Sequence, residues 1–154
     1  MSTIGRWWAV VGQPTYPQAD RLLICAAGGG SNGSRLRLWK AELQRFATAT
    51  GVAVTVCHLP PGPSKWNKLE HRLFAHSTMN WRGRPLVSHE VIVALIGATT
   101  TQGGLQIRAE RGTSTSPTKV SVSAAEMAAL TLTRHAFHGA WNYTLHPQPP
   151  PRHV

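Results

Sequence analysis

Acidic residues are scarce in this 154-residue sequence, which contains one aspartate, Asp20, and five glutamates against 16 lysines and arginines, for a formal net charge of +10. Enzymes that hold pairs of Mg²⁺ ions need two or three converging carboxylates. So few acids can barely supply such a centre, whereas the excess of cations favours a negatively charged partner such as nucleic acid.

Cysteines and long apolar runs are scarce as well. The two cysteines, Cys25 and Cys57, do not make a disulfide framework. No stretch approaches the roughly 20 apolar residues that a membrane helix needs, and the apolar run at residues 7–11 is too short for the core of an export signal. The hydrophobic content of 42% is that of a globular protein. We therefore expect a cytoplasmic protein without a membrane span, with one domain and one core.

The apolar patterning predicts alternating strands and helices. Residues 21–27 form a continuous apolar run, typical of a strand buried on both faces, and residues 52–57 form a second, β-branched strand. Between them, residues 35–48 carry a helical apolar stripe that Ser34 can cap and Gly51 ends. Two strands joined through a helix are expected to run parallel. Further helices are expected at residues 4–12, 64–79, 88–98 and 123–132, and further strands at residues 105–109 and 141–145.

The ends of the chain carry two more expectations. In the helix at residues 4–12 both tryptophans are expected to face inward, and the prolines that follow are expected to end it. The Pro-rich residues 146–154 predict an extended, disordered tail, so the folded part is expected to span residues 1–145. Because two or three strands make a small sheet, the strand at residues 21–27 is expected at an edge, or beside a strand that this chain does not contain.

A glycine-rich loop follows the first strand. Gly28, Gly30 and Gly33 match the spacing G-x-G-x-x-G between a strand and a helix, which is the setting of a dinucleotide-binding loop. Such sites also need an acidic residue at the end of the second strand to hold the ribose, but here that strand ends in Cys57 and His58. Both a nucleotide site and a plain loop remain open, and α/β proteins place their sites on loops at this end of the strands.

The helix predicted at residues 64–79 has its one acid on the apolar side. On a helical wheel, Glu70 shares an arc with the apolar residues, while the cations lie opposite. A carboxylate that faces inward is costly unless it is paired, protonated or bound to a metal. A buried salt bridge and a metal ligand are therefore the two open interpretations. The arc contains Trp66, Asn67, Leu73, Phe74 and Ser77, and the opposite cations are Lys65, Lys68 and Arg72.

The cations are concentrated in the middle of the chain. Nine of the 16 lie between Arg35 and Arg84, against two acids, and tryptophans are interleaved with them. This is the electrostatic footprint of a protein that binds a phosphate backbone. A basic, solvated surface without a ligand gives the same pattern, and no motif that reads bases is visible.

Four stretches together resemble one known family. They are residues 22–39 (LLICAAGGGSNGSRLRLW), 57–74 (CHLPPGPSKWNKLEHRLF), 80–91 (NWRGRPLVSHEV) and 132–144 (LTRHAFHGAWNYT). These stretches resemble the ISAzo-type insertion-sequence transposases, whose catalytic domain is of the DDE, ribonuclease-H-like class. The resemblance runs from about residue 7 to residue 145, and its most specific part is the block Pro-Pro-Gly-x-Ser-Lys-Trp-Asn-Lys-x-Glu-His.

The resemblance implies DNA transposition by metal-assisted strand cleavage and joining, in which three carboxylates hold Mg²⁺ at a DNA phosphate. It makes Glu70 the last of the three. The second would be an aspartate that closes the strand before the glycines, where this sequence has Ala27, and the first would lie on an upstream strand. We therefore expect a partial ribonuclease-H-like α/β fold, with a short parallel sheet flanked by helices and its N-terminal strands missing. The chain is expected to be a truncated, catalytically inactive transposase.

The expected site follows from these arguments. Glu70 is the expected catalytic residue and Mg²⁺ ligand, with Gly28, Asn32 and Asn67 lining the site, although tight Mg²⁺ binding is expected of the intact parent enzyme and not of this chain. DNA and further transposase copies in a homo-oligomer are the expected partners. Two alternatives stay open: a non-catalytic basic remnant that binds DNA, and a nucleotide-binding domain that uses the glycine-rich loop. The residues expected to contact the DNA backbone are Arg35, Arg37, Lys65, Lys68 and Arg72.

Overall fold

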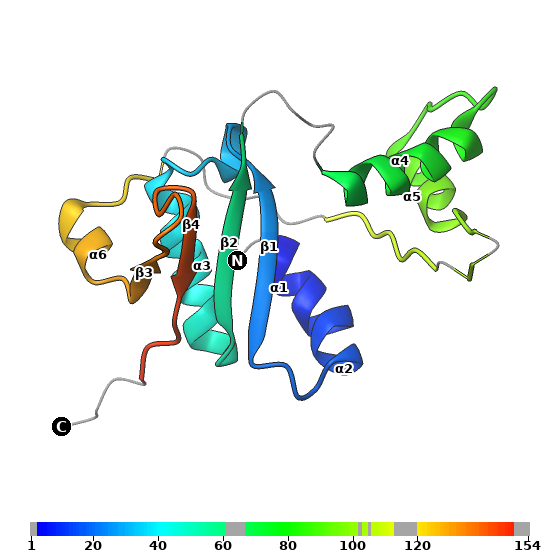
Figure 1. Cartoon of the computed structure of the whole chain (residues 1–154). Helices are drawn as coiled ribbons and strands as arrows, with labels where there is room; N and C mark the ends of the chain where they lie inside the picture. The colour runs from blue at the N-terminus through cyan, green and yellow to red at the C-terminus, as the bar shows by residue number, and fades with distance from the viewer. Residues whose placement is uncertain (1–2, 61–66, 102, 105, 113–119, 150–154) are drawn as a thin grey trace. The chain divides into compact units, whose positions relative to one another are not determined.

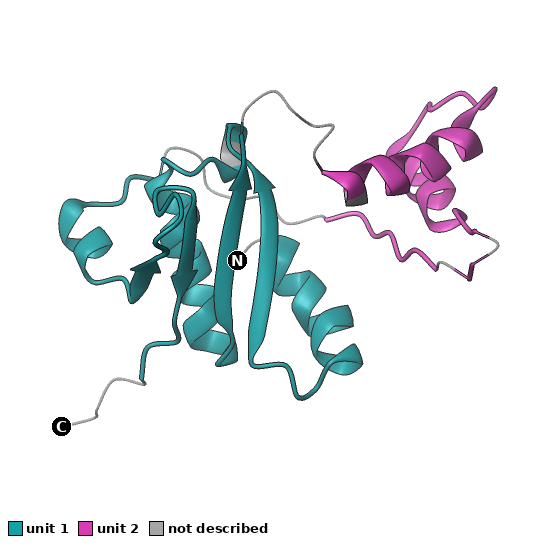
Figure 2. Cartoon of the chain, viewed as in Figure 1, with its two compact units in different colours: residues 1–63, 116–154 teal, residues 64–115 magenta. Residues whose placement is uncertain are grey.

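A computed structural model describes residues 3–60, 67–101, 103–104, 106–112 and 120–149, and it divides the chain into two compact units (Figures 1 and 2). Unit 1 combines Met1–Pro63 with Ser116–Val154, and unit 2 is Ser64–Thr115. None of the described helices is long and apolar enough to cross a bilayer. In chain order the elements are α1 (Thr3–Trp7), the π-helix η1 (Trp8–Gly12), α2 (Gln13–Thr15), β1 (Arg21–Ala27), the 3₁₀ turn η2 (Gly30–Asn32), α3 (Arg37–Thr50), β2 (Ala53–Leu59), α4 (Lys68–Trp81), α5 (His89–Gly97), α6 (Ala124–Ala128), β3 (Leu132–Arg134) and β4 (Asn142–Leu145).

A four-stranded sheet with the order β1-β2-β4-β3 forms the centre of unit 1 (Figure 1). β1 and β2 are parallel, as predicted, and run in register from the pair Arg21–Ala53 to the pair Ala27–Leu59. β4 is antiparallel to both β2 and β3. The α/β class is therefore as expected, but the sheet is mixed, because a short connection joins β3 to β4 and such connections give antiparallel pairs. β1 and β3 are its two edges.

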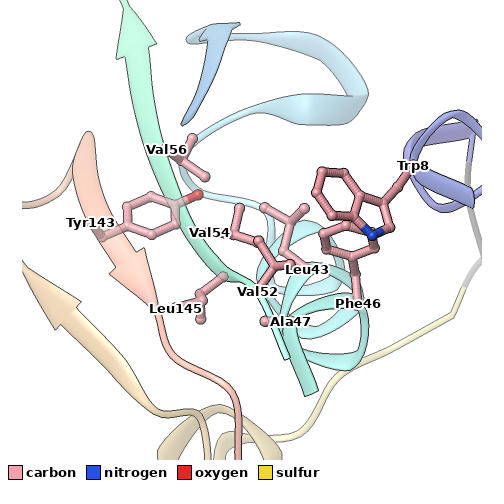
Figure 3. Packing of buried hydrophobic residues seen from close by; sticks show 9 residues of the cluster. All are labelled: Trp8, Leu43, Phe46, Ala47, Val52, Val54, Val56, Tyr143 and Leu145. Atoms are coloured by element: carbon pink, nitrogen blue, oxygen red, sulfur yellow. The ribbon is translucent and has the colours of Figure 1, made fainter. Parts of the chain in front are cut away.

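The core of unit 1 lies on one face of the sheet, between β2, β4 and helix α3 (Figure 3). Alternate residues of each strand point into it, as the two-residue period of a strand requires. Trp8 of η1 completes the cluster by packing edge-on against Phe46 of α3, with 6.2 Å between the ring centres. The buried members are Trp8, Leu43, Phe46, Ala47, Val52, Val54, Val56, Tyr143 and Leu145.

β1 buries one face only, so the prediction that this strand is buried on both faces is wrong. Leu22 and Ile24 pack against the core, whereas Leu23 is 62% exposed and Cys25 is exposed. A continuous apolar run does not reveal whether a second layer covers the other face.

The first helical segment differs from its prediction in two ways. It continues past Pro14, because that proline occupies the first turn of α2, where a missing N–H costs no hydrogen bond. Trp8 is buried as expected, but Trp7 is exposed. Adjacent residues of a helix point about 100° apart, so the rings of Trp7 and Trp8 do not share one inward face.

The C-terminal part of unit 1 holds a strand that no sequence pattern indicated. A capping box of Ser123 and Glu126 opens α6 at the start of the helix predicted at residues 123–132, but this helix ends at Ala128 and β3 follows. The chain stays bonded beyond β4, since the N–H of His146 donates to the carbonyl of Thr131 at 2.9 Å and Gln148 donates to Ala129 at 2.7 Å. The first residues of the predicted tail therefore continue the folded unit, while residues 150–154 lie outside the described ranges.

Unit 2 contains the helix pair α4 and α5. Asn80 of α4 donates from Nδ2 to the carbonyl of Leu95 in α5 at 3.3 Å, and Leu95 is the buried residue of α5. Ser88 caps α5 by accepting from the N–H of Val91 at 3.3 Å. In place of the strand predicted at residues 105–109, the described residues show a single bridge between Thr100 and Gln106.

Candidate functional site

The glycine-rich loop leaves the sheet at the carboxyl end of β1. Ala27 closes the strand, is exposed and carries only a methyl group. After it the chain turns tightly through η2, where the N–H of Gly33 donates to the carbonyl of Gly30 at 3.1 Å. Gly30 has φ +69°, and a Cβ on Gly33 would lie 3.2 Å from the same carbonyl, so the turn favours glycine at both positions. Gly28 is half-buried and Asn32 exposed beside this turn.

A chain of hydrogen bonds holds the ends of β1 and β2 together. Trp39 donates from Nε1 to the hydroxyl of Tyr143 at 3.0 Å, and this hydroxyl lies 3.1 Å from Nε2 of His58. Nδ1 of His58 lies 3.3 Å from the carbonyl of Ala27. With the His58 proton on Nδ1, each group has a partner: the tyrosine donates to Nε2, and Nδ1 donates to Ala27.

Burial favours the neutral forms of His58 and Tyr143 in this network. Burial lowers the pKa of His58, although its hydrogen bond to Ala27 opposes the shift, and burial raises the pKa of Tyr143 to about 12. Lys40 is buried above the same ring, with Nζ 5.3 Å from the centre of Tyr143. Burial and the nearby charge of Arg134 lower the pKa of this lysine.

No local pattern in the sequence signals this network. His58 and Tyr143 are 85 residues apart in the chain, so only the fold brings them together. The one available hint is that each lies two residues from an inward apolar residue of its strand, His58 from Val56 and Tyr143 from Leu145, and so shares its face. The network positions the Ala27 carbonyl at the strand end, which is where the site is expected from the sequence.

Glu70 lies exposed in the first turn of α4, and not inward as the helical wheel predicted. Ser77, on the same arc two turns later, is buried, and α4 reaches α5 through Asn80 nearby. The arc thus faces α5 at the C-terminal half of α4, whereas Leu73 and Phe74 near its start are exposed with Glu70. A helical wheel predicts which side of a helix is buried, but not how far along the helix the neighbouring element covers that side.

The other residues expected near Glu70 are placed as follows. Asn67 caps α4, because its Oδ1 accepts from the N–H of Glu70 at 3.3 Å. Lys68 and Arg72 are exposed on α4. Trp66 and Lys65 lie outside the described ranges.

Two of the cations expected to contact DNA belong to unit 1. Arg35 and Arg37 are exposed between the glycine-rich loop and the start of α3. Arg37 also donates from Nη1 to the carbonyl of Val122 at 3.3 Å, which ties the start of the helix to the segment before α6. Both arginines therefore follow the loop at the carboxyl end of β1.

Other acids of the chain have contacts away from the loop. Glu42 pairs with Arg45 on α3, Glu90 pairs with Arg111 at 2.8 Å, and Glu126 belongs to its capping box. Asp20 precedes β1, at the opposite end of the strand from Ala27. Among the described residues, no three His, Cys, Asp or Glu side chains gather as a metal site would require.

A match to one protein family decides where this fold belongs. Residues 1–147 match the family described as Rhodopirellula transposase DDE domain. The chain belongs to this family. No curated protein and no solved structure matches it.

DDE transposases use divalent metal ions, and the residues of this transposase domain do not fit such a site. Magnesium needs oxygen ligands, and Ala27, at the position where the resemblance requires an aspartate, offers none. Glu70 is exposed on α4, and within the described part of the chain no three His, Cys, Asp or Glu side chains gather into a cluster. We therefore derive no metal-dependent step for this chain.

Proposed function

We propose that this transposase domain binds the phosphate backbone of DNA and does not cleave it. The observation that carries the proposal is Ala27 at the carboxyl end of β1, where a methyl group stands in place of the second carboxylate. Glu70 is then the retained third carboxylate, with Asn67 capping its helix and Gly28 and Asn32 beside the strand end. Transposase copies are the proposed partners in a homo-oligomer.

The charges of both units support DNA binding. Arg35 and Arg37 follow the glycine-rich loop in unit 1, and Lys68 and Arg72 are exposed in unit 2. The formal net charge of +10 gives a favourable long-range attraction to a polyanion. Base recognition is not part of the proposal, because phosphate contacts carry no sequence information.

The binding test measures affinity for a random DNA duplex over a series of salt concentrations. Affinity should fall steeply with salt, with a slope of about −0.9 per phosphate contact. Each of Arg35→Ala, Arg37→Ala, Lys68→Ala and Arg72→Ala should reduce the slope by about 1, because each removes a cation that neutralises one phosphate. Arg21→Ala is the matched control, since Arg21 is exposed at the other end of β1 and should leave the slope unchanged. No detectable binding at low salt would refute this part of the proposal.

The cleavage test incubates supercoiled plasmid with the chain and Mg²⁺ or Mn²⁺. The wild type and Glu70→Gln should give the same background nicking. Ala27→Asp supplies the carboxylate that the resemblance requires at the end of β1, so this variant is assayed beside the wild type. Cleavage by the unmodified chain that Glu70→Gln abolishes would overturn the proposal.

Nucleotide binding by the glycine-rich loop is the competing function. It predicts that NAD or ATP raises the midpoint of thermal unfolding, because a ligand that binds only the folded state stabilises it. We expect no shift, because β2 ends in Cys57-His58-Leu59 without an acid for the ribose. A shift that depends on ligand concentration would favour this function over DNA binding at the loop.

A further inference from the structure

The two cysteines of the chain are direct neighbours across the parallel strands. Cys25 of β1 is the register partner of Cys57 of β2. Successive side chains of a strand alternate between its faces, and Ile24 and Val56 occupy the core side. Both thiols therefore project from the opposite face of the sheet, and both are free thiols in the structure.

The spacing of the strands suits a bond between them. Neighbouring strands lie about 4.8 Å apart, and disulfides join residues whose Cα atoms are roughly 4.4–6.8 Å apart. Side chains in register on parallel strands stay about as far apart as their Cα atoms, so the two Cβ atoms must approach by a few tenths of an ångström to about 1 Å. β1 is an edge strand, which can make this movement without displacing a neighbour on its far side.

The two thiols differ in their surroundings. Cys25 is exposed on the open face of β1, beside the exposed Leu23. Cys57 is half-buried, and burial together with the neighbouring Cys25 thiol raises its pKa. A small oxidant therefore meets Cys25 first, and Cys57 is the thiol that follows.

We propose that Cys25 and Cys57 form a reversible cross-strand disulfide when the chain meets a small disulfide such as oxidised glutathione. The Cys25 thiolate attacks one sulfur of the oxidant, forms a mixed disulfide and releases one glutathione thiolate. Cys57 loses its proton to water and attacks Sγ of Cys25, which releases the second glutathione thiolate. The protein gains one S–S bond and loses two protons and two electrons, and the oxidant is reduced to two thiols. The product links edge strand β1 covalently to β2.

The test treats the full chain with oxidised glutathione under native conditions, blocks the remaining thiols by alkylation and maps tryptic peptides by mass. Cys25 lies in the peptide 22–35 and Cys57 in the peptide 46–65. The expected product is these two peptides joined, within a monomeric chain, and its reversal by a reducing agent. A chain that carries only glutathione on Cys25, or only disulfide-linked dimers, would overturn the proposal.

Two variants test whether the register of β1 and β2 is what allows the internal disulfide to form. Leu23→Cys combined with Cys25→Ser moves the thiol two residues along the same exposed face, so that its Cα lies about 8 Å from that of Cys57. This variant should lose internal closure and retain mixed disulfides. Leu23→Cys with Thr55→Cys, in a chain whose native cysteines are serines, restores a register pair and should regain closure. Equal closure in the displaced variant and the wild type would show that the proposed geometry is not responsible.

Discussion

Replacing Tyr143 by phenylalanine removes a single oxygen atom from the centre of the network at the strand ends. The side chain is 0% exposed, and its hydroxyl joins Trp39 at 3.0 Å to His58 at 3.1 Å. The ring itself stays, so the packing against the core and beneath Lys40 is kept. The change therefore isolates the two hydrogen bonds.

The expected cost is about 1–3 kcal/mol, because buried polar groups on Trp39 and His58 lose their partner. For a chain of this size about 1 kcal/mol lowers the midpoint of thermal unfolding by roughly 2–4 °C. The Tyr143→Phe variant should therefore unfold about 2–12 °C lower at pH 8. Tyr16→Phe is the matched control, since Tyr16 is exposed and should leave the midpoint unchanged.

The alkaline pH dependence gives a second, independent signature. Burial raises the pKa of Tyr143 to about 12 from 10.0 in the unfolded chain. A raised folded pKa contributes stability that is present below pH 10 and is lost as pH rises towards 12. That loss is roughly 1 kcal/mol by pH 11 and roughly 3 kcal/mol in full. The phenylalanine variant has no such group, so its disadvantage against the wild type should shrink between pH 10 and pH 12.

The measurement is chemical denaturation of both proteins, followed by circular dichroism, at pH 8, 10 and 11. We expect a gap in unfolding free energy that has begun to narrow at pH 10 and is roughly 1 kcal/mol smaller at pH 11 than at pH 8. A gap that does not change with pH would refute the buried, neutral state of this tyrosine. No gap at pH 8 would refute the hydrogen-bonded network.

Three further predictions concern the core, a helix end and an acid. Phe46→Ala removes a buried ring from the core and should lower the unfolding free energy by about 3–5 kcal/mol in denaturant titrations. Phe74→Ala removes an exposed ring from α4 and should change the unfolding free energy by less than about 0.5 kcal/mol. Gly51→Ala should cost about 1 kcal/mol in the same assay, because Gly51 ends α3 with φ +73°; an unchanged midpoint would contradict that geometry. Hydrogen bonds from the backbone and side chain of Ser123 lower the pKa of Glu126, so the wild type should be more stable than Glu126→Gln near neutral pH. This difference in stability should vanish as pH falls through the lowered pKa. A difference that stays constant down to pH 2 would count against the capping box.

Strong local signals predicted most of the elements near their observed bounds. The apolar run at residues 21–27 coincides with β1, and the helix predicted at residues 88–98 corresponds to α5. Gly51 ends α3 as predicted, since its N–H donates to Ala47 at 2.9 Å from a left-handed conformation. In each case the deciding physics lies within a few residues of the chain.

Features set by distant partners could not be predicted in this way. β3 is three residues long and is a strand because β4 pairs with it, so no periodicity marks it. The direction of β4 against β2 depends on the path of the intervening chain. Likewise, the exposure of Glu70 depends on how far α5 extends along α4. The hydrogen bond between His58 and Tyr143 depends on the pairing of β2 with β4.

The position of β4 in the sheet has a consequence during synthesis. β4 is the last of the described elements, yet it lies between β2 and β3, and residues 64–115 are inserted before it. At the usual rate of about 5–20 residues per second, the last residue of β2 is added roughly 4–17 s before Leu145. During that interval β1 and α3 are already available to β2, but the edge of β2 that receives β4 has no partner strand, and an unpaired strand edge is a site at which a nascent chain can aggregate.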